Sequence, residues 1–522
     1  MKKVSFLWLL ASAFLIIGCA EGYESPNGFD MGVKNAQMVT PIQDSISFKV
    51  STDGKTATVS WPTVAGADGH EVTFMNVDDP EHPFIVDDYD KKIIDGSKFV
   101  VTVTEDSKYQ MTMRTLGNKK LGNTDAEAPS TFHFTTLVPS VMTIPSGEEI
   151  SSYIASHPID ESREEVAIDL EPNGVYTLAD TVDFTSHRLT FRGDKIHRPT
   201  VNITQTGHFE TYSTLKVKYI NFDMTESTAG GFIAMSKQAP DSILVQNLWP
   251  YNLPNVNSGL NTGHYMVEDP IYVGSCWFKN LPHAMLYDNG INCAFWYFTL
   301  SDCIVQMKNT TNSNIGFINM YTRGKSVKHI VLENSTIFNV VDNSAACFIR
   351  YQNASNSQPH KTYGSYSADY RSQSWTFSRC TFSKTYTGWR FVNNTHAANH
   401  TLRVDHCIFN DVSQLYRMNQ GASILYRFNF LWSPRQDDLN RNSSMKDGGG
   451  APFASIYDPL FAGDVTQEMD FSKPNGGVDF TPQEYTIVAN RGGDPRWLPG
   501  GAGAEEEEEI LNPKYNNVEE QL

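Results

Sequence analysis

Three arginines with similar neighbours are the residues of this chain whose type and spacing best suit ligand chemistry. Arg350, Arg390 and Arg417 each stand in a short apolar segment with an aromatic side chain, Trp389 and Tyr416 among them. Asparagine or glutamine side chains follow each segment. A planar guanidinium group grips a carboxylate through two parallel hydrogen bonds, so these residue types predict a site for an anionic ligand.

The three arginine segments fall at corresponding places on successive sequence repeats. We therefore expect the guanidinium groups to stack about one strand spacing apart, roughly 4.8 Å. Like charges at that distance repel each other unless an anion lies among them, and a uronate polymer presents such anions repeatedly. The alternative is that the arginines point outward at a solvated face, or pair with acids such as Asp342.

One repeat is enlarged by residues 352–373, which carry several tyrosines among amide side chains. Tyrosine rings and amides suit the apolar faces and hydroxyl groups of sugars, and a loop on a rigid scaffold is a common place for a site. The alternative is a disordered surface insertion. The candidate carbohydrate-binding residues are therefore Arg350, Arg390, Arg417, Trp389, Tyr416, Tyr363 and Tyr366.

The composition is that of a folded, acidic protein. The 522 residues are 40% hydrophobic and 19% charged, and the formal net charge is −18. This balance argues against a nucleic-acid partner, because a phosphate backbone needs a basic surface. Residues 301–436 nonetheless hold 14 Lys and Arg against six Asp and Glu. A basic middle in an acidic chain suits an anionic ligand bound in one place, and chance clustering on a solvated face is the alternative.

A repeat organises the larger part of the chain. The pattern apolar-x-apolar-x-x-(small or apolar)-x-apolar recurs with its third positions at residues 220, 248, 276, 303, 335, 380, 407 and 429. A β pattern with a period of two to three dozen residues is typical of a parallel β-helix, in which each coil stacks on the last. Cysteine fills four of these positions: Cys276, Cys303, Cys380 and Cys407. We expect reduced thiols stacked in the core rather than disulfides.

The first part of the chain has a different organisation. Lys2, Lys3 and the apolar run 4–17 have the form of a signal peptide, and the Ile-Gly-Cys sequence ending at Cys19 resembles a bacterial lipoprotein box. Downstream, alternating apolar residues such as Tyr109, Met111 and Met113 predict strands with one buried face. This region resembles a fibronectin type III or related immunoglobulin-like sandwich.

These observations predict an all-β chain with an N-terminal immunoglobulin or fibronectin III-like β-sandwich followed by a parallel β-helix. The expected segments are a signal peptide at 1–18, a tether at 19–38, the sandwich at 39–137, the β-helix at 146–500 and an acidic, disordered tail at 501–522.

Residues 160–465 resemble the right-handed parallel β-helix of the pectate-lyase-like superfamily. The whole arrangement, with its signal and sandwich, is similar to uncharacterised lipoproteins of polysaccharide utilisation systems. The resemblance implies a protein anchored by lipid on Cys19 to the outer membrane of a Gram-negative bacterium, facing the exterior. It also implies that the partner is a polysaccharide, and the arginines indicate an acidic one.

Lyases of this superfamily join calcium, held by clustered carboxylates, to an arginine or lysine that removes the proton α to a uronate. By resemblance, Arg390 or Arg417 would be this catalytic base. The acidic cluster is missing from the same stretch, where the aspartates are isolated, and no cysteine–histidine pattern supports a metal site. Two functions remain: a lipoprotein that binds an acidic polysaccharide without a cofactor, or a lyase, with calcium, that cleaves uronate polymers by β-elimination.

Overall fold

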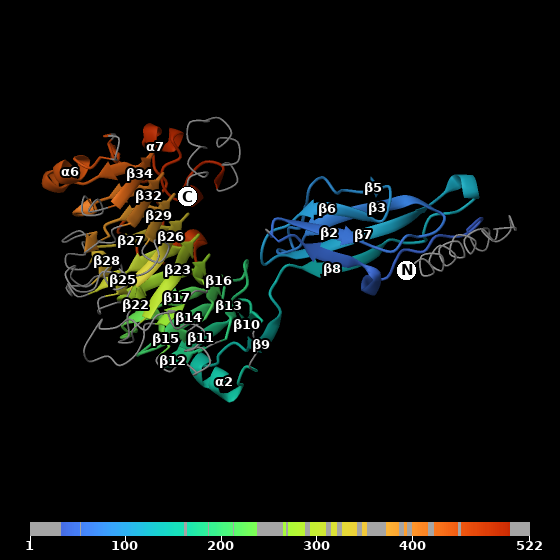
Figure 1. Ribbon diagram of the computed structural model, residues 1–522, viewed down its shortest axis with the longest axis horizontal. Coiled ribbons are helices and arrows are strands. Elements are labelled where there is room, and N and C mark those ends of the chain that lie inside the picture. Colours follow the sequence, from blue (N-terminus) through green and yellow to red (C-terminus); the bar gives the residue numbers. More distant parts are fainter. Residues whose placement is uncertain are drawn as a thin grey trace, which may run out of the picture. The chain divides into compact units, whose positions relative to one another are not determined.

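The computed structural model describes residues 33–501, apart from 53, 161–163, 186, 212, 237–264, 268–269, 288–292, 309–314, 321–325, 342–346, 352–371, 386–390, 394–398, 416–421, 447–449 and 451. The chain divides into two compact units, Met1–Val138 and Pro139–Leu522 (Figure 1). Among the described residues no helix is long and apolar enough to cross a bilayer.

The first unit is a β-sandwich of two antiparallel sheets. One sheet holds β1 (Ser47–Val50), β2 (Thr56–Ser60) and β6 (Lys98–Thr102); the other holds β3 (Ala67–Asn76), β4 (Phe84–Ile85), β5 (Lys92–Ile94), β7 (Lys108–Gly117) and β8 (Ser130–Thr135). The alternating residues Tyr109, Met111 and Met113 are at most 2% exposed, which confirms the predicted buried face of β7. Trp61 and Phe74 pack in the same core.

The second unit is a parallel β-helix built from three sheets, and all its strand pairings within these sheets are parallel. Sheet 1 runs through β9 (Ser140–Ile144), β10 (Val166–Leu170), β13 (Leu189–Arg192), β16 (Leu215–Lys218), β20 (Ile271–Gly274), β23 (Cys293–Ser301), β26 (Ser326–Glu333), β29 (Ser372–Ser378), β32 (Asn399–Asp405) and β34 (Ala422–Arg427), with β19 (Tyr265–Val267) beside β23. The β9 strand extends the helix a few residues upstream of its predicted start at 146.

Each coil continues from sheet 1 into sheet 2 and then sheet 3. Sheet 2 runs through β11 (Val175–Leu178), β14 (Thr200–Ile203), β17 (Asn221–Asp223), β21 (Trp277–Leu281), β24 (Ile304–Met307), β27 (Thr336–Asn339), β30 (Thr381–Ser383), β33 (Ile408–Asn410), β35 (Phe430–Trp432) and β36 (Ser455–Ile456). Sheet 3 runs through β12 (Thr181–Asp183), β15 (His208–Thr211), β18 (Gly231–Met235), β22 (Ala284–Tyr287), β25 (Gly316–Met320), β28 (Cys347–Tyr351) and β31 (Val392–Asn393).

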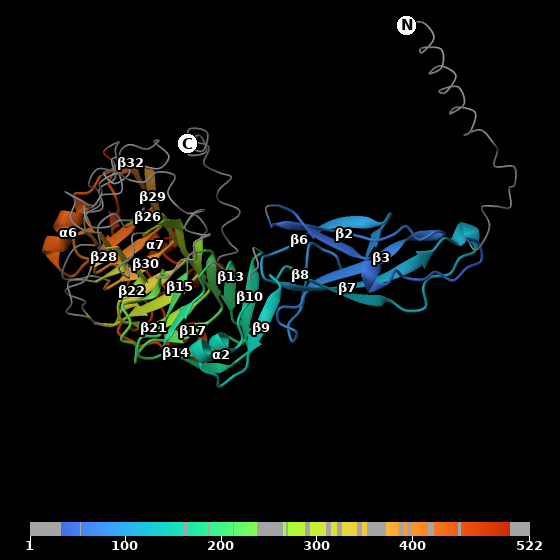
Figure 2. The same ribbon diagram turned by 60° about the horizontal axis from the view of Figure 1, so that its bottom comes forward.

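Three short α-helices accompany the coils among the described residues. Helix α2 (Ile150–Ser156) lies beside β11 and β12 and buries Ile150 in the core. Figure 2 shows this helix near β9, at the start of the β-helix. Helix α6 (Gln436–Ser443) lies beside β35, and α7 (Tyr485–Ala489) belongs to the segment after the last coil.

A left-handed turn joins sheet 1 to sheet 2 in successive coils. Residues Tyr219, Ser275, Asp302, Asn334, Arg379, His406 and Phe428 all have φ between 47° and 60°. The next residue in each coil points into the core, and these residues include Cys276, Cys303, Cys380 and Cys407, all 0% exposed and free. Each of these thiols donates to the carbonyl oxygen two residues earlier, as Cys303 does to Ser301 at 3.2 Å.

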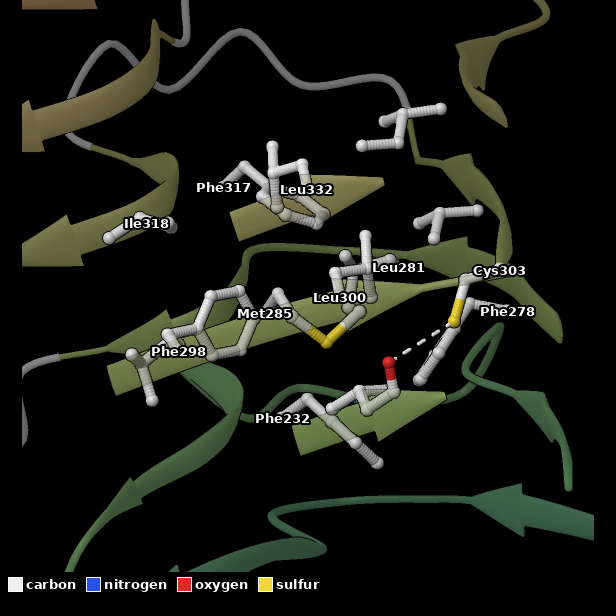
Figure 3. Close-up of a cluster of buried hydrophobic side chains, with 14 of the residues drawn as sticks. Phe232, Phe278, Leu281, Met285, Phe298, Leu300, Cys303, Phe317, Ile318 and Leu332 are labelled. Carbon is white, nitrogen blue, oxygen red and sulfur yellow. Dashed lines mark hydrogen bonds between the residues drawn. The ribbon is translucent and has the colours of Figure 1, made fainter. Parts of the chain in front are cut away.

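The thiol ladder confirms the predicted repeat. Figure 3 shows Cys303 among Phe278, Leu281 and Leu300 in the interior. Burial raises the pKa of Cys276 to about 12, so this thiol stays protonated and unreactive at neutral pH. Ser335 occupies the same position in its own coil and donates to Glu333 O at 2.6 Å.

One predicted coil is wrong. The apolar pattern around residues 243–248 suggested a strand, but β16 pairs directly with β20, Leu215 with Ile271 and Val217 with Val273. Sheet 1 therefore has no place for a strand between them. Residues 243–248 lie in an insertion, 237–264, that is outside the described residues. The spacing of apolar residues alone therefore does not distinguish a coil of the β-helix from a segment inserted between two coils.

The segment that follows the last coil packs along the outer face of sheet 2. Phe480 and Trp497 cover Ile304 and Phe338, and Trp497 Nε1 donates to Thr336 Oγ1 at 2.7 Å. Thr336 in turn donates to the carboxylate of the buried Asp494 at 2.7 Å. These contacts hold residues 494–497 against the side of the coil stack.

We call the contacts of Asp494 and Trp497 with Thr336 the C-terminal clasp. The buried carboxyl group of Asp494 predicts that the stability of the protein depends on pH. Burial raises the pKa of Asp494 to about 6, although Arg496 and Thr336 act in the opposite direction. The folded carboxyl group holds its proton more tightly than the unfolded one, so its contribution to the free energy of unfolding is full below about pH 4 and is lost as pH rises through about 6. Urea unfolding of the wild type should show that the free energy of unfolding falls by about 1–3 kcal/mol between pH 4 and pH 7. The Asp494→Asn variant should lack this fall. A wild-type-minus-variant difference that stays constant from pH 4 to 7 would contradict the raised pKa.

Candidate functional site

Sheet 3 presents one row of outward-facing side chains. The strand register aligns Asp183, Glu210, Ala234, Tyr287, Asn319, Arg350 and Asn393, one on each strand from β12 to β31. The residues just before them, from Val182 to Val392, are at most 3% exposed and fill the core. Because side chains alternate across a strand, those from Asp183 to Arg350 face away from the core, and the aligned positions recur about every 4.8 Å. We call this row the outer column.

A glutamate–histidine pair lies at the β15 end of the outer column. His208 Nδ1 is 2.7 Å from the carbonyl oxygen of Thr206, which can only accept, so Nδ1 carries a hydrogen. The other nitrogen, Nε2, is 3.1 Å from Glu210 Oε1. Glu210 is 3% exposed and His208 is 5% exposed. The pair therefore holds a proton between nitrogen and oxygen in a place that is shielded from water.

A second carboxylate stands beside this pair. Asp183 is the register partner of Glu210 and is itself more exposed. The Ser236 hydroxyl donates to its carboxylate at 2.6 Å, and Thr185 N donates at 2.9 Å. Burial of the carboxylate raises the pKa of Asp183, the two hydrogen bonds oppose this, and the charge of Glu210 adds to the rise.

The Tyr287 side chain, on β22, lies over β18. The next strand beyond β18 is β15, which carries Glu210. The Tyr287 ring meets the His208 ring edge-on at 5.7 Å. A Cβ atom at Gly231 would lie 2.5 Å from the Tyr287 ring, and one at Gly230 would lie 2.9 Å from it. The two glycines therefore let the ring lie over β18. Burial raises the pKa of Tyr287, and the charge of Glu210 adds to this, so the phenol keeps its hydrogen at neutral pH.

The other end of the outer column carries an amide and a guanidinium group. Arg350 Nη1 donates to Asn319 Oδ1 at 3.4 Å, and Arg350 is 3% exposed. Its register partner on β31 is Asn393. The outer column thus has carboxylates at one end and a buried cation at the other.

The predicted arginine ladder has the wrong register. Ile349 pairs with Val392 and Arg350 with Asn393, so Arg390 precedes the register partner of Arg350 by three residues. The similar local sequences aligned two arginines that backbone pairing does not align. Of the predicted site residues, Arg350 alone falls among those that the structure describes; Arg390, Arg417, Trp389, Tyr416, Tyr363, Tyr366 and the lipidation site Cys19 lie outside them.

Sequence reasoning missed the carboxylate end of the outer column. Acids were expected close to the arginines, whereas Asp183 and Glu210 stand in earlier coils. The triplets Thr-Val-Asp and His-Phe-Glu, each with an apolar residue between two polar ones, could have indicated outward-facing acids. The two adjacent glycines at the start of β18 could have indicated a close approach of another side chain.

Calcium, which the lyase resemblance implied, does not fit these residues. Within the described parts of the chain, no three His, Cys, Asp or Glu side chains are placed to hold a metal ion. Asp183 and Glu210 supply only two carboxylates, and hydrogen bonds from Ser236 and His208 already occupy oxygens of both. Calcium binds six to eight oxygens.

Comparisons with known proteins give two family matches. Residues 1–181 match a domain of unknown function, DUF4992, and residues 174–340 match a second one, DUF4957. Among curated proteins, no sequence matches the chain.

Two solved structures are weakly similar to this chain in sequence and in structure. A PL6 family alginate lyase shares 12% identity and a TM-score of 0.31, over 57% of this chain and 38% of the lyase. A Family 28 exopolygalacturonase of Yersinia enterocolitica shares 10% identity and a TM-score of 0.17, over 79% of this chain and 84% of that one. The chain therefore spans well under half of the alginate lyase. The assignment of the fold rests on the strand pairings described above.

The packing of Tyr287 over β18 predicts an energetic coupling. Gly230→Ala should lower the free energy of unfolding by about 1 kcal/mol or more, because the new methyl group pushes against the ring. In a Tyr287→Ala background the same change should cost less, since the ring is gone. Urea unfolding of both single variants and the double variant measures the coupling. Strictly additive effects would mean that the ring does not rest on this strand.

Proposed function

We propose that the chain binds an acidic polysaccharide along the outer column of sheet 3. The observation that carries this proposal is the position of Arg350, which stands in register with Asn319 on the neighbouring coil and with Tyr287 on the coil beyond it. A parallel β-helix repeats its side chains at a fixed spacing, which suits a polymer that repeats its own groups.

The chemistry of this end of the column suits a carboxylated sugar. A guanidinium group binds a carboxylate through charge-assisted hydrogen bonds, and poor access of water weakens the screening of that attraction. The amide of Asn319 and the half-buried phenol of Tyr287 can bond sugar hydroxyl groups. Because Arg350 is 3% exposed, a ligand reaches it by displacing the groups that now shield it.

Binding should depend on Arg350. Charge-assisted hydrogen bonds contribute about 1.5–3 kcal/mol, so Arg350→Ala should weaken binding of a uronate polymer about tenfold or more. Arg350→Lys should recover part of the affinity, because it keeps the charge and loses the planar fork. Affinity gels or calorimetry with alginate and polygalacturonate measure this, with a neutral glucan for comparison.

The matched control is Arg403→Ala, which removes an exposed arginine from the outer face of sheet 1. This variant should keep the wild-type affinity. Thermal unfolding of each variant separates a lost contact from a lost fold. If folded Arg350→Ala binds every acidic glycan as well as the wild type, the site lies elsewhere.

Cleavage by β-elimination is the second candidate function, and the Glu210–His208 pair beside Tyr287 favours it. A lyase needs a group that accepts the proton α to the uronate and one that protonates the leaving oxygen. In the binding experiment, ultraviolet absorbance of unsaturated products would indicate cleavage, and Tyr287→Phe should then abolish the increase. Bound polymer without such products would favour a binding protein.

The proposal includes attachment to the outer membrane through Cys19, facing the exterior. The support is the sequence alone: a basic start, a short apolar run and a cysteine after a small residue. Cys19→Ala should move the protein from the membrane fraction to the soluble fraction after cell lysis, as an immunoblot would show. A variant that still sediments with membranes after a salt wash would contradict the lipid anchor.

A further inference from the structure

Sheet 1 is widest over four neighbouring coils. Strands β13, β16 and β20 have four residues each, whereas β23, β26, β29 and β32 have nine, eight, seven and seven. The four longer strands pair in this order and lie side by side (Figure 1). Their extra residues come before the apolar core pattern, so they add outward-facing positions that the shorter strands lack.

Two aligned rows of side chains cover the outer face of these strands. The residue after each member of the first row is 0% exposed in the core, so the row itself faces outward. The first row holds Tyr297, His329, Ser374 and Thr401. The second row, two residues further along each strand, holds Thr299, Val331 and Thr376. We call these two rows the sheet 1 platform.

Aromatic rings gather at the β23 end of the sheet 1 platform. The Tyr297 and His329 rings are stacked with their centroids 4.9 Å apart, and the Trp296 ring lies 6.3 Å from that of Tyr297. His329 Nδ1 is 2.7 Å from the hydroxyl oxygen of Ser374, which holds the imidazole in place. Tyr297 is nevertheless 44% exposed. A tyrosine ring that is held by its neighbours and open to water suits the apolar face of a sugar, and its hydroxyl group suits the polar edge.

The rest of the sheet 1 platform offers hydroxyl groups without formal charge. Its serine and threonine side chains are half-buried, and a hydroxyl group both donates and accepts hydrogen bonds, as sugar hydroxyl groups do. The second row continues to Arg403 on β32, at the end away from the rings. Glu333, on β26, stands outside both rows and accepts a hydrogen bond from the Ser301 hydroxyl at 2.9 Å. Because neither row holds Asp, Glu, Lys or Arg within the sheet 1 platform, its chemistry favours an uncharged sugar.

We infer that the sheet 1 platform is a second polysaccharide site, and that its ligand is an uncharged polysaccharide. The polymer crosses the strands, one sugar ring packs on Tyr297, and further units bond the serine and threonine hydroxyl groups. Aligned positions recur about every 4.8 Å, and such a fixed spacing suits a repeating ligand. The outer column belongs to sheet 3, so this second site does not depend on Arg350.

Affinity gels with the full chain test this site, with galactan, arabinan, a mixed-linkage glucan and galactomannan as the uncharged probes. At least one probe should retard the wild type. Tyr297→Ala should weaken that binding about fivefold or more, because the contact between ring and sugar is lost. Tyr297→Phe should keep most of the affinity, since it keeps the ring. Thermal unfolding checks that each variant is folded.

The matched control is Tyr485→Ala. Tyr485 is a tyrosine on α7 that is 81% exposed and lies outside the sheet 1 platform, so its loss should leave the affinity at the wild-type value. Arg350→Ala should also leave binding of the uncharged probes unchanged, because Arg350 lies on sheet 3.

The outcomes separate this inference from the proposed function. If none of the four probes binds the wild type, or if folded Tyr297→Ala binds them as tightly as the wild type, the second site is wrong. Equal losses in Tyr297→Ala and Tyr485→Ala would also contradict it. None of these results bears on acidic polymers at Arg350, and a failure of acidic polymers to bind would leave a Tyr297-dependent site for uncharged ones in place.

Discussion

Backbone pairing between successive coils is the constraint on which the rest of this structure depends. Each strand bonds to the strand of the same sheet in the coil before it, so one register fixes the position of every side chain in the row. The core ladder of thiols and the outer column are two results of the same pairing. A shift of one residue in any coil would exchange the inner and outer faces of that strand.

The interior of the β-helix was predictable from the sequence because the stack imposes a pattern on it. Leu215, Ile271, Phe298, Ile330, Trp375, Leu402 and Ile424 are register partners in sheet 1, and each begins a copy of the apolar pattern. The left-handed turn follows at a constant distance, so the cysteine positions could be aligned by counting. The same counting failed at residues 243–248, because spacing does not show whether an apolar stretch pairs with its neighbours.

The outer column was harder to predict for a physical reason. Outward side chains need not resemble one another, because no shared core selects their type. Strands of sheet 3 are also short, and β31 has two residues, so the sequence offers little from which to derive their register. Arg350 was found by its residue type, but its partners were misplaced. Asp183, Glu210 and Tyr287 come from coils that are far apart in the sequence, and the strand pairing brings them together.

The C-terminal clasp, which lies along sheet 2, forms only after the coils of the β-helix have been made. Each coil needs only the coil before it, so coils can stack as the chain leaves the ribosome. Ile304 and Phe338, however, face outward on sheet 2 and are covered by residues of the last part of the chain. The bond between Arg496 and Asp302 spans 194 residues. The apolar strip on sheet 2 therefore remains exposed to solvent during synthesis until the final segment covers it. A nascent chain that stalls before this point exposes an apolar surface that can aggregate with other chains.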